Sequence, residues 1–236
     1  MDPLDVRKAN LYSDKNNQTH YGQTIVDNVL PELIDELEAS SNYRQRRQHI
    51  QAFNQNSPFI KKGLSLTPVK FGISFTAKHL NQAGALVHIY TDGSIEVNHG
   101  GTEMGQGLHT KIRSIVAAQF GVSDDKVRVS ATRTDKVPNT SPTAASSGTD
   151  LNGKASENAC ITIKNRLIDF ICDTHQCEKS SVTFIDGVVK FADETLPFAE
   201  LVQQAYFARI SLSSTGFYQT PEIHYDRDKA WGNPFY

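Results

Sequence analysis

The feature that most restricts the fold of this chain is a glycine-rich turn between a strand-like and a helix-like segment. Residues 100–107 read GGTEMGQG, with four glycines in eight positions. Glycine adopts positive φ at little cost and lets the backbone approach another group closely. Apolar residues at helical spacing follow the turn at Leu108, Ile112, Ile115, Val116 and Phe120. The pattern predicts a strand, a tight loop and a helix whose first N–H groups face whatever the loop holds.

The segments around this turn predict an α+β fold. Asp92-Gly93 and Asp186-Gly187 each separate two strand-like runs, which is typical of a tight β-hairpin. Helical spacing predicts helices over 25–39, 42–54, 151–172 and 197–208. In the first of these, Ile25, Val29, Leu33 and Leu37 are expected to face inward, and Thr195 is expected to cap the last. Hairpins and helices alternate without a steady β-α-β-α rhythm, so we expect a mixed sheet with β-hairpins and packed helices.

Composition excludes several functional classes. The 236 residues carry 24 Lys and Arg against 26 Asp and Glu, so no basic excess predicts a nucleic-acid partner. No apolar run approaches the roughly 18 residues of a membrane helix, and no secretory signal begins the chain. We therefore expect a cytoplasmic protein with no nucleic-acid and no membrane partner. Cys160, Cys172 and Cys177 form no C-x-x-C pair and predict buried thiols in a reducing compartment.

The glycine turn itself predicts a phosphate-bearing ligand at the helix start. Gln106 stands where a Walker loop requires lysine, and Thr110 stands where the dinucleotide fingerprint requires its third glycine. The alternative is a tight turn in which the glycines serve packing. Glu103, inside the turn, is expected to stabilise it rather than to act as a catalytic carboxylate.

A second loop offers a similar helix start. Residues 139–149 read NTSPTAASSGT, with many hydroxyls and small side chains just before a predicted helix. Hydroxyls donate and accept hydrogen bonds, and small side chains permit close backbone approach. A Ser/Thr-rich linker is the alternative. We expect the two helix starts to converge on one large polyanionic cofactor, to which Gln106 presents its amide.

Several segments together resemble the molybdenum hydroxylase family and, within it, the xanthine dehydrogenases. They are residues 71–76 (FGISFT), 80–86 (LNQAGAL), 100–111 and 137–146 (VPNTSPTAAS), with weaker flanks at 2–12 and 211–221. The resemblance implies part of a molybdopterin-binding domain in an internal fragment of a longer enzyme. Residues 1–60 would be the helical end of a first molybdenum-binding domain, and residues 61–236 the first part of a second. The aromatic end, WGNPFY, also predicts a piece of a longer polypeptide.

The family's reaction is implied for the parent enzyme. Such an enzyme hydroxylates hypoxanthine and xanthine to urate with water-derived oxygen and passes electrons to NAD. It carries molybdenum-molybdopterin, with FAD and [2Fe-2S] clusters in other parts. The implied partners are the rest of the molybdenum-binding subunit, the iron–sulfur/FAD subunit or domains, and a purine substrate. The alternatives are an aldehyde-oxidase-type fragment and a non-enzymatic module that binds a phosphate ligand.

No catalytic residue is expected in this chain. The resemblance places the family's catalytic glutamate beyond Tyr236 and its purine-gripping side chains before Met1. The chain alone is therefore expected to be inactive, to lack the cofactor and to self-associate through an exposed interface.

The resemblance also implies roles for individual residues. Cofactor-binding residues would be Gly105, Gln106, Gly107, Ala145, Ser146 and Ser147. The backbone of Ala145 would lie near the molybdenum, which the pterin holds without a side-chain ligand from the protein.

Phe75 would pack against the purine, with Thr76 beside it. Adjacent residues of a regular strand point to opposite faces, so both touch a substrate only if the strand bends or ends there. The alternative for Phe75 is core packing with Phe71 and Ile73.

Overall fold

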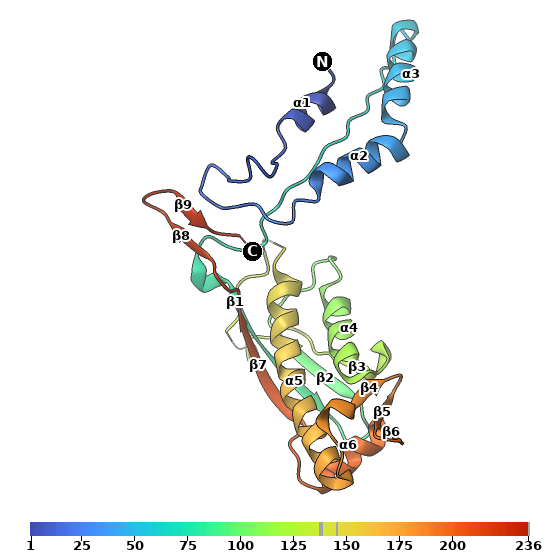
Figure 1. Ribbon diagram of the computed structural model, residues 1–236, viewed down its shortest axis with the longest axis vertical. Coiled ribbons are helices and arrows are strands. Elements are labelled where there is room, and N and C mark those ends of the chain that lie inside the picture. The colour runs from blue at the N-terminus through green and yellow to red at the C-terminus, as the bar shows by residue number, and fades with distance from the viewer. Residues whose placement is uncertain (137–138, 145, 236) are drawn as a thin grey trace. The chain divides into compact units, whose positions relative to one another are not determined.

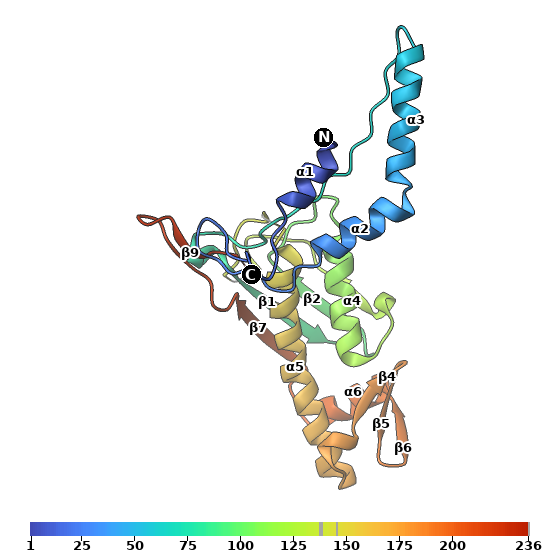
Figure 2. The same ribbon diagram turned by 45° about the horizontal axis from the view of Figure 1, so that its top comes forward.

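A computed structural model describes residues 1–136, 139–144 and 146–235 of the chain. It contains two compact units, and Figures 1 and 2 show their elements. The first unit comprises Met1–Gly72 and Tyr225–Asn233, and the second comprises Ile73–His224 with Pro234 and Phe235. The assignment of residues 1–60 and 61–236 to two molybdenum-binding domains stays a prediction.

The first unit is built from three helices, α1 (Pro3–Ala9), α2 (Leu30–Ser40) and α3 (Tyr43–Asn56). Asp2 begins α1 as a capping residue, because its Oδ1 accepts a hydrogen bond from the Leu4 N–H at 2.9 Å. The small core consists of Leu4, Ile34, Tyr43 and Leu66. Strands β8 (His224–Asp226) and β9 (Trp231–Asn233) form a two-stranded sheet.

The inward face predicted for the helix over 25–39 is wrong. The helix begins only at Leu30, next to Pro31 in its first turn, and Asp27 has a positive φ of 49°. Leu33 and Leu37 are exposed, and Ile34 is buried instead. The buried stripe is shifted by one residue because the core that Leu4 and Tyr43 supply meets Ile34, with Leu30 packed beside it one turn earlier.

The second unit contains a four-stranded mixed sheet in the order β3-β2-β1-β7. Its strands are β1 (Gln82–Ile89), β2 (Ile95–His99), β3 (Val127–Val129) and β7 (Ser213–Gln219). Strand β1 pairs antiparallel with β2 and β7, whereas β2 and β3 are parallel. The predicted hairpin is confirmed: Gly93 has a φ of +83° and Asp92 Oδ1 accepts from the Ser94 N–H at 2.9 Å. The α+β prediction with a mixed sheet is likewise confirmed.

Helices α4 (Leu108–Phe120) and α5 (Gly148–His175) pack against each other and against the sheet (Figure 1). Alternate residues of β1 supply the sheet side of this core, from Ala83 and Ala85 to Val87 and Ile89. Leu86, on the opposite face, is 41% exposed. Helix α5 lies so close to β7 that a Cβ on Gly216 would come within 2.5 Å of the Ala159 nitrogen. The sheet therefore holds both helices on one face.

A second, three-stranded sheet follows α5. It comprises β4 (Thr183–Ile185), β5 (Val188–Phe191) and β6 (Glu194–Pro197), and α6 (Phe198–Phe207) follows. Thr195 is not the cap that the sequence predicted. It lies in β6 opposite Lys190, and Pro197 occupies the capping position of α6. Short 3₁₀ turns η1 (Lys78–Leu80), η2 (Asp124–Lys126) and η3 (Lys179–Ser181) complete the fold. Over the residues described, no helix has the length and apolar character needed to cross a bilayer.

Candidate functional site

The glycine turn uses its glycines in two different ways. Gly105 and Gly107 have φ values of +95° and +75°, and a Cβ on either would meet only open space. Their requirement is conformational. Gly100 and Gly101 instead allow close approach: a Cβ on Gly100 would lie 2.5 Å from Thr140 Oγ1, and one on Gly101 2.5 Å from a methyl carbon of Leu108. The turn is thus held against both the following helix and the second loop.

Glu103 occupies the N-terminus of α4. Its carboxylate accepts hydrogen bonds from the N–H groups of Gly105 (2.9 Å), Gly107 (3.0 Å) and His109 (3.0 Å). These bonds, of which that from His109 has the largest effect, lower the pKa of Glu103 below its ordinary value. The anion at this helix start is therefore a side chain of the protein itself. The turn-stabilising role expected for Glu103 agrees with this geometry.

The Gln106 amide is also used within the turn. Its Oε1 accepts from the Met104 N–H at 2.6 Å, and its Nε2 donates to the Thr102 carbonyl at 2.8 Å. The side chain remains exposed. Gln106 therefore stabilises the loop conformation. Its exposed amide could form a further hydrogen bond from this fixed position.

The second loop meets the first directly. The Thr102 N–H donates to Thr143 Oγ1 at 2.8 Å, which joins two segments 41 residues apart in the sequence. Ser147 is buried, and its hydroxyl donates to the Ala144 carbonyl at 3.0 Å. Ser147, at the capping position of α5, makes no side-chain hydrogen bond to the first N–H groups of that helix. Ser146 is exposed with φ of +58°, and Ala145 lies outside the described residues.

A cavity of about 420 Å³ lies where the two loops meet. Apolar, amide, cationic and hydroxyl side chains from both loops and both helices line it: Met104, Leu108, Gln106, Lys111, Thr143, Ser146 and Thr149. The predicted convergence of the two helix starts is therefore observed, and it brings Gln106 and Ser146 to one cavity. Sequence reasoning missed Lys111. Its place in the first turn of α4, four residues after Gly107, could have indicated that it lies near the turn.

Two histidines, His99 and His109, lie next to the glycine turn. His99 is buried, and its Nδ1 accepts from the Gly101 N–H at 3.0 Å. Burial, assisted by nearby His109, lowers the pKa of His99 to about 4. The ring is consequently neutral, and its proton is on Nε2. The rings of His99 and His109 stack edge to face at 5.3 Å. The His99 ring thus holds the backbone of the turn directly, whereas the His109 ring contacts the turn through His99.

Phe75 and Thr76 lie on irregular chain before η1, not on a strand. The buried Asn81 amide holds this bend: its Oδ1 accepts from the Phe75 N–H at 2.7 Å and its Nδ2 donates to the Phe75 carbonyl at 2.8 Å. The bend removes the objection that adjacent strand residues face opposite sides. Phe75 and Ile73 are half-buried and Phe71 is exposed, so core packing stays an alternative for Phe75. Phe75 and Thr76 are not among the described residues that line the cavity of about 420 Å³.

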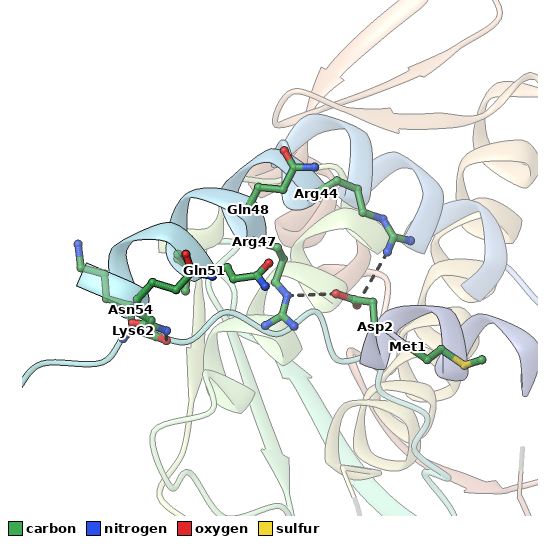
Figure 3. Close-up of a pocket in the computed structure, with 10 residues that line it drawn as sticks. Met1, Asp2, Arg44, Arg47, Gln48, Gln51, Asn54 and Lys62 are labelled. Carbon is green, nitrogen blue, oxygen red and sulfur yellow. Dashed lines mark hydrogen bonds and ion pairs between the residues drawn. The ribbon is translucent and has the colours of Figure 1, made fainter. Parts of the chain in front are cut away.

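A larger hollow of about 760 Å³ lies in the first unit (Figure 3). Its arginines are already paired. Arg47 Nε lies 3.1 Å from an Asp2 oxygen, and Arg44 bonds Asp5 at 2.6 Å as well as Glu38. The hollow therefore lies beside a structural ion-pair network that joins α1 to α3.

Known proteins similar to this chain agree on one family. The model of the molybdopterin cofactor-binding domain matches residues 36–236. Xanthine dehydrogenase/oxidase of Rattus norvegicus is 43% identical over 98% of this chain, and xanthine dehydrogenase of Dictyostelium discoideum is 43% identical over 100% of it. The chain spans 16% of the length of each of these relatives.

Solved structures share the fold at low sequence identity. Quinoline 2-oxidoreductase of Pseudomonas putida 86 aligns over 94% of this chain and 30% of its own, with a TM-score of 0.75 and 20% identity. CO dehydrogenase of Oligotropha carboxidovorans aligns over 95% and 30% respectively, with a TM-score of 0.73 and 17% identity. With the family model covering most of the chain, this protein belongs to the molybdopterin cofactor-binding domain family.

Proposed function

We propose that the chain is an internal fragment of a xanthine dehydrogenase and forms one wall of its molybdopterin site. The observation that carries the proposal is the cavity of about 420 Å³ between the starts of α4 and α5, lined by Gln106 and Ser146. The relatives named xanthine dehydrogenase match nearly every residue of the chain.

The side chains of the cavity suit a pterin that carries a phosphate. The hydroxyls of Thr143, Ser146 and Thr149, which line the cavity, could donate and accept hydrogen bonds, as the edge of a pterin requires. Lys111 supplies a positive charge, and the uncapped N-terminus of α5 favours a phosphate. Helix α4 is different, because Glu103 already occupies its first N–H groups. The donor set therefore fits such a cofactor, and α5 and Lys111 would hold its anionic end.

Each predicted site residue then has a defined task. Gly105 and Gly107 give the turn its positive φ values, and without a Cβ their backbone could approach the cofactor closely. Gln106 holds the turn and lines the cavity. Ser146 offers its hydroxyl, and the Ser147 hydroxyl fixes the loop through Ala144. Ala145 is proposed to bring its backbone close to the metal.

The reaction is proposed to be the hydroxylation of hypoxanthine and xanthine to urate, with electrons passed to NAD. When bound, the molybdenum cofactor supplies the two-electron oxidation and the water-derived oxygen. FAD, [2Fe-2S] clusters and the catalytic base would come from other parts of a cytoplasmic enzyme. Phe75 and Thr76 are proposed to contact the purine, with Asn81 holding their backbone.

The test compares two lysine variants of the enzyme expressed with its native flanking sequence. Lys111→Met removes the charge at the cavity, and Lys126→Met removes an exposed charge on η2 as the matched control. A hydrogen bond to a charged partner is worth about 1.5–3 kcal/mol, so apparent affinity for the cofactor should fall about 10- to 150-fold in Lys111→Met. The measurement is molybdenum and pterin content per folded protein over a titration of free cofactor.

Equal cofactor content in both variants would contradict the site. Substrate class is tested separately by turnover of xanthine and of an aromatic aldehyde with NAD. Oxidation of the aldehyde alone would favour an aldehyde-oxidase-type enzyme. The 236-residue chain by itself is expected to turn over neither substrate and to carry little molybdenum.

A further inference from the structure

The far end of α5 carries a pair of thiols in contact. Cys172 lies in the last turn of the helix, and Gln176 then adopts the left-handed conformation (φ 52°, ψ 45°). This residue turns the chain back over the helix end, so that Cys177 returns to Cys172. The two Sγ atoms are 3.4 Å apart, and neither is in a disulfide.

The environment of the pair differs from that of the third cysteine. Cys160 is fully buried in the middle of α5, and burial raises the pKa of its thiol to about 12. Cys172 and Cys177 are only half-buried at the edge of the core. The sequence prediction of buried thiols therefore holds for Cys160 and is wrong for the pair. Burial and the contact with Cys177 raise the pKa of Cys172 to about 11.

We propose that Cys172 and Cys177 form a reversible modification site, an intrachain disulfide made by exchange with a low-molecular-weight disulfide such as oxidised glutathione. The Cys177 thiolate attacks one sulfur of the small disulfide, and its partner leaves as a thiolate. Cys172 then loses its proton to solvent and attacks the Cys177 sulfur, which releases the second small thiolate. Two protein thiols are oxidised, one disulfide is reduced, and the protons go to solvent.

Two features favour closure within the chain over a stable mixed disulfide. The helix end holds both sulfur atoms in contact before reaction, so little conformational freedom remains to be lost. The raised pKa of Cys172 keeps that thiol protonated, so we assign the first attack to Cys177 and the second to Cys172. The bridge would fasten the last turn of α5 to the segment that enters β4.

This site is independent of the proposed cofactor site. The cavity lies at the first residue of α5, Gly148, and Cys172 lies 24 residues further along the same helix. At about 1.5 Å per residue the two are roughly 36 Å apart along the axis. Loss of cofactor binding would leave the dithiol inference untouched, and failure of the dithiol to close would leave the cofactor site untouched.

The test uses the purified protein in buffers with graded ratios of oxidised to reduced glutathione. After each equilibration, free thiols are blocked with N-ethylmaleimide and the protein is digested with trypsin. Residues 167–179, LIDFICDTHQCEK, form one tryptic peptide with both cysteines, and Cys160 lies in another. The wild-type peptide is expected to become lighter by two hydrogen atoms and to carry neither blocker nor glutathione. Closure should occur at a glutathione ratio about tenfold more reducing in native protein than in denaturant.

Variants separate the proposal from general thiol reactivity. Cys160→Ser should form the disulfide like the wild type. In the wild type, N-ethylmaleimide should label Cys160 only after denaturation. Cys172→Ser should leave Cys177 as a mixed disulfide with glutathione. Glutathione on both Cys172 and Cys177 in the wild type, or closure at the same ratio in native and denatured protein, would overturn the proposal.

Discussion

Gly100 is the point at which the two loops of the candidate site touch, and its substitution should separate them. A Cβ added there would lie 2.5 Å from both Cγ2 and Oγ1 of Thr140 and closer still to its Cβ. Gly100 does not have a positive φ, so Gly100→Ala introduces no backbone strain of its own. Its effect should be steric. Overpacking of this kind costs about 1–3 kcal/mol.

The expected result is a lower melting temperature. For a chain of this size, 1 kcal/mol corresponds to about 2–4 °C, so Gly100→Ala should lose about 2–12 °C in a thermal melt followed by circular dichroism. The decisive comparison is the double variant with Thr140→Gly. That change removes the Cβ, Cγ2 and Oγ1 atoms together and by itself costs about 0.5–1 kcal/mol in added chain freedom.

The two changes should compensate each other. In the double variant the added methyl group occupies the space of the missing Thr140 side chain, and we expect a coupling energy of about 1–2 kcal/mol in favour of the pair. The reasoning is refuted if Gly100→Ala melts with the wild type. It is equally refuted if the two destabilisations simply add, because Gly100 would then not face Thr140.

Two further predictions concern Glu103 and Gly216 of the second unit, with Gly63 of the first unit as a control. The pKa of Glu103 is lowered from 4.5 in the folded state, so its ionisation contributes stability that is present above that value and lost as pH falls through the folded-state pKa. Glu103→Gln should therefore be less stable than wild type at neutral pH in urea unfolding. The difference should shrink as the pH falls below 4.5, and equal stability at neutral pH would contradict the cap. Gly216→Ala should destabilise by about 1–3 kcal/mol, because its Cβ would meet the backbone of α5, whereas Gly63→Ala, in open space, should match the wild type in the same unfolding assay.

Much of the local structure was predictable because neighbouring residues decide it. Asp92-Gly93 fixed a hairpin, and Gly121 ended α4 with a φ of +60°. The start of α2 and the strand that contains Thr195 were not predictable in this way. Ile34 is buried because Leu4 and Tyr43 lie opposite it, and Thr195 is extended because Lys190 pairs with it. Both depend on contacts distant in sequence.

The candidate site likewise has features that local sequence decides and features that distant contacts decide. The sequence by itself determined that two small-residue loops each precede a helix, since glycine conformation and helical spacing are local properties. Only the tertiary structure decided that Thr102 bonds Thr143 across 41 residues and that the hydroxyl of Ser147 bonds Ala144 instead of capping α5. Hydrogen-bond donors and acceptors are satisfied by whichever partner the packed fold brings within about 3 Å, and no spacing along the chain records that choice.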